Sequence, residues 1–308
     1  MADLINPARI DFVTLRLFCA VAQAGSISKG AKACNLALSA ASRRLSDFED
    51  SAQSVFFDRG ARGISLTPSG HVALQHALRL VHGYERFSSE LREHAKGARG
   101  HVRLWANMSA LTEVLPRALA AFAERHPDIR VEIEDESSGE VVRALVEGLA
   151  DVGVFGENTP AFGLDVSEFH RDELVVLCAK AHPFARARRR AVSFRACLEH
   201  DFVGLGRGTS LVELTSAAAA RLGIPMRVRV QVRSFDTACR MIAENLGIGV
   251  LPLAACEPQV RSLGLHVVRL TEPWADRRLL LGTKAGASLS PAGVFLLAHL
   301  TEMTRAGP

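Results

Sequence analysis

The chain has no apolar run that approaches the roughly 20 residues of a membrane-spanning helix. Its first residues, Met1, Ala2, Asp3 and Leu4, also lack the basic and apolar segments with which a secretory signal peptide begins. Nothing in the sequence therefore directs the chain into or across a membrane. We expect a protein of the cytoplasm with no membrane partner.

Cysteine is scarce and scattered. No two of the six cysteines form a CxxC pair, and several lie in apolar contexts. This pattern favours buried free thiols over a disulfide framework or a zinc site. The cysteines are Cys19, Cys34, Cys178, Cys197, Cys239 and Cys256.

Signatures of catalysis and of cofactor binding are missing as well. The 11 histidines include no HExxH spacing, and no serine lies in a GxSxG motif. The glycine-rich run from Gly204 to Thr209 lacks the third glycine of a dinucleotide-binding fingerprint. These absences argue against an enzyme, a resident metal and a cofactor.

Net charge is small, because 37 basic residues oppose 33 acidic ones. A chain with a net charge of +4 cannot coat nucleic acid by overall charge, so any such binding needs a local basic patch. A length of 308 residues, 48% of them hydrophobic, is enough for about two domains with packed cores.

One segment near the start has the pattern of two short helices joined by a tight turn. Ile27, Ala31 and Cys34 have helical spacing, and the same spacing returns after a turn at residues 35–37. The second helix turns short polar and basic side chains outward, which suits a helix that enters the DNA major groove. We expect DNA contacts from Ser28, Leu38, Ser39, Ser42, Arg43 and, toward phosphate, Arg44.

Flanking segments complete a winged helix-turn-helix. An amphipathic helix that includes Phe12, Leu15 and Cys19 precedes the pair and ends at Gly25, which is suited to a left-handed stop. Two short apolar runs then enclose a glycine-rich tip that carries Arg59 and Arg62. This pattern predicts a β-hairpin wing whose arginines contact the DNA backbone or the minor groove.

Motifs along nearly the whole chain resemble the LysR-type transcriptional regulators, a bacterial family. In the first part they are residues 15–18, 20–22, 25–26, 31, 42–43, 49 and Leu66-Thr67-Pro68-Ser69-Gly70. In the second part they are residues 101–104, 115–116, 122, 126–127, 148–154 and 246–252, in the family's order. One departure lies at Ala37-Leu38, where the family commonly has Gln as the second residue; loss of this amide changes the expected base contacts.

The resemblance implies a multidomain α/β protein. Its parts are a winged helix-turn-helix domain at 9–66, a long linker and dimerisation helix at 67–96, and an effector-binding domain at 101–304. That last domain would resemble type 2 periplasmic binding proteins, with one subdomain at 101–160 and 270–304 and another at 161–269. Implied partners are promoter DNA, a small effector, RNA polymerase and further copies of the chain, as a dimer or a dimer of dimers.

The residues themselves support the linker and the α/β layers. Leu74, Ala77, Val81, Tyr84, Ser88 and Leu91 have the spacing of a short coiled-coil seam. Beyond residue 100, strands and helices alternate, which predicts largely parallel sheets. Expected strands are 102–106, 129–134, 152–155, 174–179, 202–205, 228–232 and 249–251, and expected helices are 109–125, 139–147, 209–222, 235–245 and 291–303.

Ligands in such sheets bind beyond the carboxyl ends of strands, where helix starts offer free N–H groups. Ser and Thr at these places can also be simple helix caps. Taken together they predict a site for a polar or anionic effector, with aromatic walls. The candidate residues are Asn107, Met108, Ser109, Ser137, Ser138, Phe155, Gly206, Thr209, Ser210, Ser234 and Phe235.

Two other readings compete with the regulator. The second part of the chain would also suit a solute-binding protein of the transport-receptor type, but the helix-turn-helix and the missing signal peptide count against it. An α/β enzyme is the third reading, and it lacks an assembled nucleophile, base or metal set.

Overall fold

The computed structural model describes residues 10–60, 63–96, 100–206 and 208–306. The chain forms two compact units that divide between residues 97 and 98. Within the described residues, no helix is both long and apolar enough to cross a membrane.

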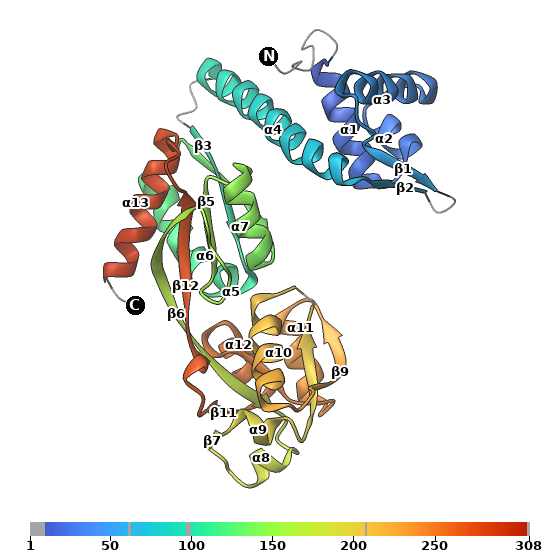
Figure 1. The fold of residues 1–308 in the computed structure, drawn as a ribbon. Helices are drawn as coiled ribbons and strands as arrows, with labels where there is room; N and C mark the ends of the chain where they lie inside the picture. Colours follow the sequence, from blue (N-terminus) through green and yellow to red (C-terminus); the bar gives the residue numbers. More distant parts are fainter. Residues whose placement is uncertain (1–9, 61–62, 97–99, 207, 307–308) are drawn as a thin grey trace. The chain divides into compact units, whose positions relative to one another are not determined.

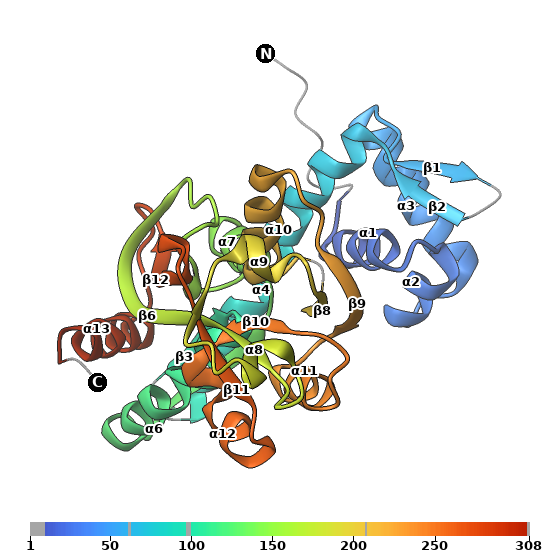
Figure 2. The same ribbon diagram turned by 90° about the horizontal axis from the view of Figure 1, so that it is seen from below.

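The first unit is a winged helix-turn-helix followed by a long helix (Figures 1 and 2). Its order is α1 (Phe12–Ala24), α2 (Ile27–Ala33), α3 (Leu38–Ala52), β1 (Phe57–Gly60), β2 (Gly63–Leu66) and α4 (Pro68–Lys96). Asp11 caps α1 by accepting a 2.7 Å hydrogen bond from the Thr14 amide, and Gly25 ends it in the left-handed conformation with φ of 59°. The predicted helices, turn and wing are therefore confirmed.

Aromatic packing fixes the wing against the helices. Phe18 of α1 has its ring centroid 5.5 Å from Phe48 and 5.2 Å from Phe57. The Glu49 carboxylate accepts hydrogen bonds from the amides of Phe56 (2.7 Å) and Phe57 (3.1 Å). Because Glu49 lies on α3, these bonds tie the start of the hairpin to the second helix of the pair.

The apolar stripe of α4 differs from the predicted seam. Ala77 and Val81 are buried in the core of the first unit, so they are not available to a partner helix. Four other large apolar residues of α4 are between 52% and 60% exposed. They are Val72, Leu80, Tyr84 and Phe87, of which only Tyr84 belongs to the predicted seam. Ala77 and Val81 pack inward because α4 also covers α1, and the side chain of Leu91 lies outside the described residues.

In the second unit, the first subdomain is a sheet covered on both faces (Figure 1). Its strands are β3 (Gly100–Ala106), β4 (Ile129–Asp135), β5 (Val152–Gly156) and β12 (Asp276–Lys284). Helices α5 (Met108–Glu113), α6 (Leu115–Arg125) and α13 (Pro291–Ala306) pack on one core, and α7 (Ser138–Glu147) on the other. The single helix predicted at 109–125 breaks at Val114, because Pro116 fits only a first helical turn.

The second subdomain is built around β6 (Leu164–Cys178), whose end pairs with β10 (Gly249–Pro252) and β11 (His266–Leu270). β11 also pairs with β7 (Ala191–Val192), and β8 (Asp201–Leu205) pairs with β9 (Arg227–Val232). The helical elements are α8 (Pro183–Arg186), α9 (Phe194–Cys197), α10 (Ser210–Leu222), α11 (Phe235–Ala243), α12 (Leu253–Leu263) and the 3-10 turn η2 (Pro273–Ala275). They share one apolar core with these strands.

Two long strands join the subdomains. β6 and β12 pair antiparallel from Leu164↔Lys284 to Glu173↔Asp276, and β6 then continues into the second subdomain (Figure 1). The sheets are therefore mixed rather than largely parallel. The β6–β12 pairing reaches Glu173 and Asp276, beyond which β6 pairs with β10 and β11. The first half of β6 is mostly exposed, so it lacks the apolar signal of a strand.

Candidate functional site

The proposed DNA-reading face of α3 is open to solvent. Leu38 is 54% exposed at the first position of the helix, and Ser39 and Arg43 are exposed one and five residues later. Ser42 is half-buried. On the opposite face Ala41, Leu45 and Phe48 are buried, so the helix is amphipathic as predicted. Ala37 precedes α3 and has no side-chain oxygen, so it cannot accept hydrogen bonds from the first amides of the helix.

Arg43 and Arg44 have different environments. The Arg43 side chain is 85% exposed, with only a 3.9 Å ion pair to Asp47. Arg44 instead donates to Asp11 Oδ2 at 2.7 Å and to Thr14 Oγ1 at 3.1 Å. Arg44 therefore holds α3 to the start of α1 and is engaged within the unit.

The remaining candidates of the first unit lie at its edges. Ser28 is exposed on α2, with its hydroxyl 3.0 Å from that of Ser26, which caps the helix. Arg59 lies on β1, and Arg62 lies outside the described residues. Gly30 makes the compact α1–α2 crossing possible, because a Cβ at this position would overlap Val21.

A pocket of about 750 Å³ opens between the two subdomains of the second unit. It is lined from the first subdomain by the starts of α5 and α7, and from the second by the starts of α10 and α11. Most of the predicted effector residues line it: Asn107, Met108, Ser109, Ser137, Ser138, Gly206, Thr209, Ser210 and Phe235. The structure thus brings together helix starts that are far apart in the sequence.

Several of these polar groups are already engaged in holding the pocket wall. Asn107 caps α5 and donates from Nδ2 to Ser138 Oγ at 3.1 Å. Ser138 Oγ also accepts from the Gly156 amide at 3.1 Å. Thr209 caps α10, and its hydroxyl donates to the Gly206 carbonyl at 3.2 Å. These bonds fix the helix starts relative to the strands that precede them.

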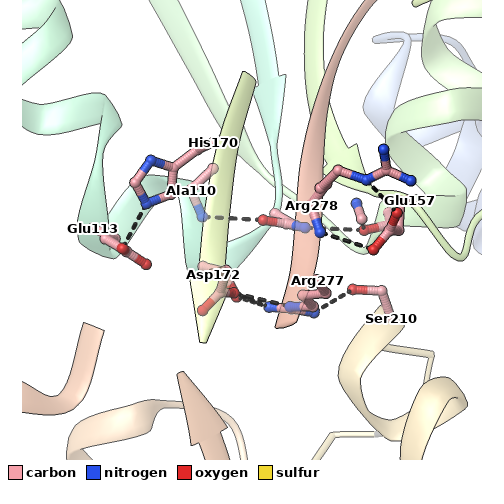
Figure 3. A network of polar contacts seen from close by, with 12 residues as sticks. Ala110, Glu113, Glu157, His170, Asp172, Ser210, Arg277 and Arg278 are labelled. Carbon is pink, nitrogen blue, oxygen red and sulfur yellow. Dashed lines mark hydrogen bonds and ion pairs between the residues drawn. The ribbon is translucent and has the colours of Figure 1, made fainter. Parts of the chain in front are cut away.

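A buried arginine links the two sides of the pocket. Arg277, at the start of β12, donates from Nε to Asp172 Oδ2 at 2.9 Å across the paired strand β6. Its two terminal nitrogens also donate to Ser109 Oγ (2.6 Å) in the first subdomain and to Ser210 Oγ (3.5 Å) in the second. Figure 3 shows the guanidinium between Asp172 and Ser210. The guanidinium therefore contacts both subdomains at the crossing, by which we mean the place where the paired strands β6 and β12 pass from one subdomain to the other.

Burial sets the electrostatics of this crossing. The Asp172 side chain has no exposed surface, and this burial raises its pKa although the Arg277 charge acts in the opposite direction. Its Oδ1 atom has no hydrogen-bond partner. Nearby, His170 Nε2 lies 2.6 Å from Glu113 Oε1, and this hydrogen bond raises the pKa of His170 (Figure 3).

Two predicted effector residues do not line the pocket. Phe155 is fully buried in the core beneath α7, because all of β5 is covered on both faces. Ser234 caps α11 by accepting from the Thr237 amide, as the alternative reading of helix-start serines allows.

Sequence reasoning missed four charged residues. Asp135, Glu136 and Arg233 line the pocket, and burial raises the pKa of Asp135. Asp135 is the last residue of β4, Glu136 directly follows it, and Arg233 directly follows β9. The rule that selected Ser137 and Ser234, which looks at the carboxyl ends of strands, could therefore have found them. Arg277 gave no such signal, because its partners are 67 to 168 residues away along the chain.

The six cysteines carry thiols, as expected. All are buried except Cys34, which is half-buried. Burial raises the pKa of Cys178 to about 11 and that of Cys197 to about 12. Cys239 and Cys256 form a hydrogen-bonded pair between α11 and α12. Among the described residues, no group of three or more His, Cys, Asp or Glu side chains is placed to hold a metal ion.

Comparison with known proteins agrees with this architecture. Residues 12–71 match the bacterial regulatory helix-turn-helix of the lysR family, and residues 95–305 match the LysR substrate-binding domain. A probable HTH-type transcriptional regulator, LrrA of Synechococcus elongatus, is 29% identical over 83% of this chain and 86% of its own length.

Solved structures share the fold. Full-length CbnR, crystallised with its target DNA complex, matches with a TM-score of 0.68 at 18% identity, over 95% of this chain and 99% of that one. The regulatory domain of Synechocystis CcmR, in complex with 2-PG, matches with a TM-score of 0.61 at 22% identity, over 67% and 98%. The family matches cover both units, and the chain belongs to the LysR-type transcriptional regulators.

Proposed function

We propose that this regulator binds promoter DNA with residues 9–66 and that a small effector bound within residues 101–304 controls the binding. On α3, the exposed Leu38, Ser39 and Arg43 and the half-buried Ser42 would face the major groove, with Ser28 and the wing arginines at the flanks. Arg44 would act by positioning α3 through Asp11. Such a protein acts in the cytoplasm, where it meets DNA and RNA polymerase.

Self-association is part of the proposal. Residues 67–96 would pair two chains, so that two recognition helices read two half-sites separated by whole turns of the duplex. The exposed stripe of Val72, Leu80, Tyr84 and Phe87 supports this role, since a helix rarely leaves four large apolar residues in water. A dimer, or a dimer of dimers, would bury the stripe.

The pocket between the subdomains, where Ser109 and Ser210 both contact Arg277, is the observation that carries the effector proposal. Ser109 Oγ and Ser210 Oγ both accept hydrogen bonds from this guanidinium, so each hydroxyl keeps its own proton to donate. Two such donors, together with helix starts and Arg233, suit a ligand rich in acceptor oxygens. We propose a polar or anionic effector, with Phe235 as its aromatic wall.

An effector can shift the equilibrium between two arrangements of the subdomains only if it binds these arrangements with different affinity. Arg277 contacts Ser109 and Ser210 in opposite subdomains, so a ligand that engages these hydroxyls would favour one arrangement of the β6–β12 crossing. A regulatory role is favoured over catalysis because the matched families describe DNA binding and ligand binding. The helix-turn-helix match disfavours a transport receptor.

DNA binding is tested with the intergenic DNA upstream of the protein's own gene. We expect binding that weakens with salt, and Arg43→Ala and Arg62→Ala variants that each reduce affinity about tenfold with a shallower salt dependence. Arg261→Ala is the matched control, because this exposed arginine lies on α12 of the other unit. Binding that is absent, or equal in all variants, contradicts the proposal.

The effector pocket is tested separately by thermal unfolding in a panel of small carboxylates and other polar metabolites. A compound that stabilises the protein should lose this effect in a Ser109→Ala, Ser210→Ala variant that still binds DNA. Full stabilisation of the double variant would place the effector elsewhere.

A further inference from the structure

A second pocket, of about 440 Å³, lies within the second subdomain between α10 and the strands β8 and β9. It extends from Leu211 at the start of α10 to Met226 and Val228 beyond its end. Leu205, Leu211 and Gln231 line both this pocket and the one between the subdomains, so the two are neighbours that share part of a wall.

The sequence of α10 explains why side chains do not fill this space. At each turn, the helix presents smaller residues to the strands: Leu211 and Val212, then Thr215 and Ser216, then Ala219 and Ala220, and finally Gly223. A helix that closes on a sheet ordinarily fills the gap with large apolar side chains. Here the residues shrink toward the end of α10, and on β8 Gly204 adds no side chain. The gap between α10 and the strands therefore remains open.

The lining of this pocket is apolar. Phe202, Val203, Leu205, Val250 and Leu251 are each at most 6% exposed and form its inner wall, and Ile224, Met226 and Val228 lie toward its far end. Val228 is 48% exposed, which places it at the mouth. A molecule that enters would pack against the inner wall and remove the exposed surface of Ile224, Met226 and Val228 from water. Such burial is the main source of affinity for apolar ligands.

The polar groups of the lining are few and mostly engaged. The Thr215 hydroxyl lies within hydrogen-bond distance of two carbonyls of its own helix, those of Leu211 and Val212. Gln231 donates from Nε2 to the Leu205 carbonyl at 2.7 Å. Among the described residues that line the pocket, none carries a formal charge. A charged ligand would lose its hydration here without gaining a charged partner, so the pocket disfavours ions.

We propose that this pocket is a binding site for a neutral, apolar small molecule. Its volume falls within the roughly 300–1,000 Å³ of small-molecule sites. The site is chemically distinct from the pocket between the subdomains, which holds Asp135, Glu136 and Arg233. The two would therefore select different molecules, the polar effector in one and an apolar compound in the other.

The test uses N-phenylnaphthylamine, a neutral fluorophore that brightens in apolar surroundings, titrated against the full chain. We expect saturable binding of one probe per chain. Ala219→Leu and Ala220→Leu each place a larger side chain in the pocket and should weaken probe binding about tenfold or more, a loss of about 1.4 kcal/mol. Ala220 is exposed, so its substitution is compatible with folding even if that of buried Ala219 is not.

Ala217→Leu is the matched control, because Ala217 is exposed on the same helix and does not line the pocket. This variant should bind the probe like the unaltered chain, and so should Ser109→Ala in the other pocket. The anionic analogue anilinonaphthalene sulfonate should bind at least about tenfold more weakly than the neutral probe. Equal binding by the Ala220→Leu and Ala217→Leu variants, or a preference for the sulfonate, would overturn the proposal.

Discussion

At the scale of single residues, Arg277 shows how a buried charge depends on its partner. Its side chain is 2% exposed, and that of Asp172 is not exposed at all. Removal of the cation by Arg277→Met leaves the carboxylate buried and uncompensated, so we expect a loss of about 3–5 kcal/mol in the free energy of unfolding. Urea unfolding of the full chain measures this loss in the transition of the second unit.

The adjacent arginine is the natural control. Arg278 is 52% exposed and pairs with Glu157 at the surface, so Arg278→Met should lower the free energy of unfolding far less than Arg277→Met does. An Asp172→Asn, Arg277→Met double variant should recover most of the loss, because no buried charge remains. If Arg277→Met were no more costly than Arg278→Met, the buried pair would not hold the crossing together.

Residues that act through local chemistry could be predicted, and Arg277 could not. Ser109, Ser138 and Thr209 were found because a hydroxyl after a strand marks a helix start. The role of Arg277 depends on the register that sets it opposite Asp172 on a strand 105 residues away. Periodicity within a single segment contains no information on such a register.

At the scale of elements, the short helix α8 depends on the protonation of one histidine. Neutral His182 caps it, with Nδ1 accepting from the Phe184 amide at 3.3 Å. Burial, helped by the nearby His200, lowers the pKa of His182 to about 4. The folded state thus favours neutral histidine, so its contribution to stability is complete above about pH 6.5 and is lost as the pH falls toward 4.

We expect His182→Asn to remove part of this acid sensitivity, because an Asn oxygen caps a helix without titrating. Between pH 7 and pH 4.5, Tm of the unaltered chain should fall several degrees further than Tm of the variant; about 1 kcal/mol corresponds to roughly 2–4 °C in a domain of this size. Parallel losses in the two proteins across this pH range would exclude the role of His182.

Elements with strong local signals were predicted well, and the crossing strands were not. α1, α2 and α3 each combine an apolar stripe with a capping or turn residue, so their limits follow from the sequence. β12 and the first half of β6 were missed. β6 has five consecutive residues, from Leu164 to Glu168, that are exposed or half-buried, and its partner strand lies more than 100 residues further along the chain. Pairing across the chain, and not propensity, makes these segments strands.

At the scale of the whole molecule, the apolar stripe of α4 is the surface proposed to join two chains. Val72, Leu80, Tyr84 and Phe87 follow helical spacing along one side, while Ala77 and Val81 pack inward. If a second α4 covers the stripe, Leu80→Glu and Phe87→Glu set charges against each other and against apolar surface. Sedimentation velocity should then show a shift of each variant toward monomers.

Loss of the dimer should also weaken DNA binding. A monomer engages one half-site, so it forgoes the gain in affinity, about 10²–10⁴-fold, that linked binding sites provide. Gln75→Glu, at an exposed polar position of the same helix, should remain paired and bind DNA normally. Leu80→Glu and Phe87→Glu chains that stay paired, or monomers that retain full affinity, would show that the stripe has another partner and that the two recognition helices do not act together.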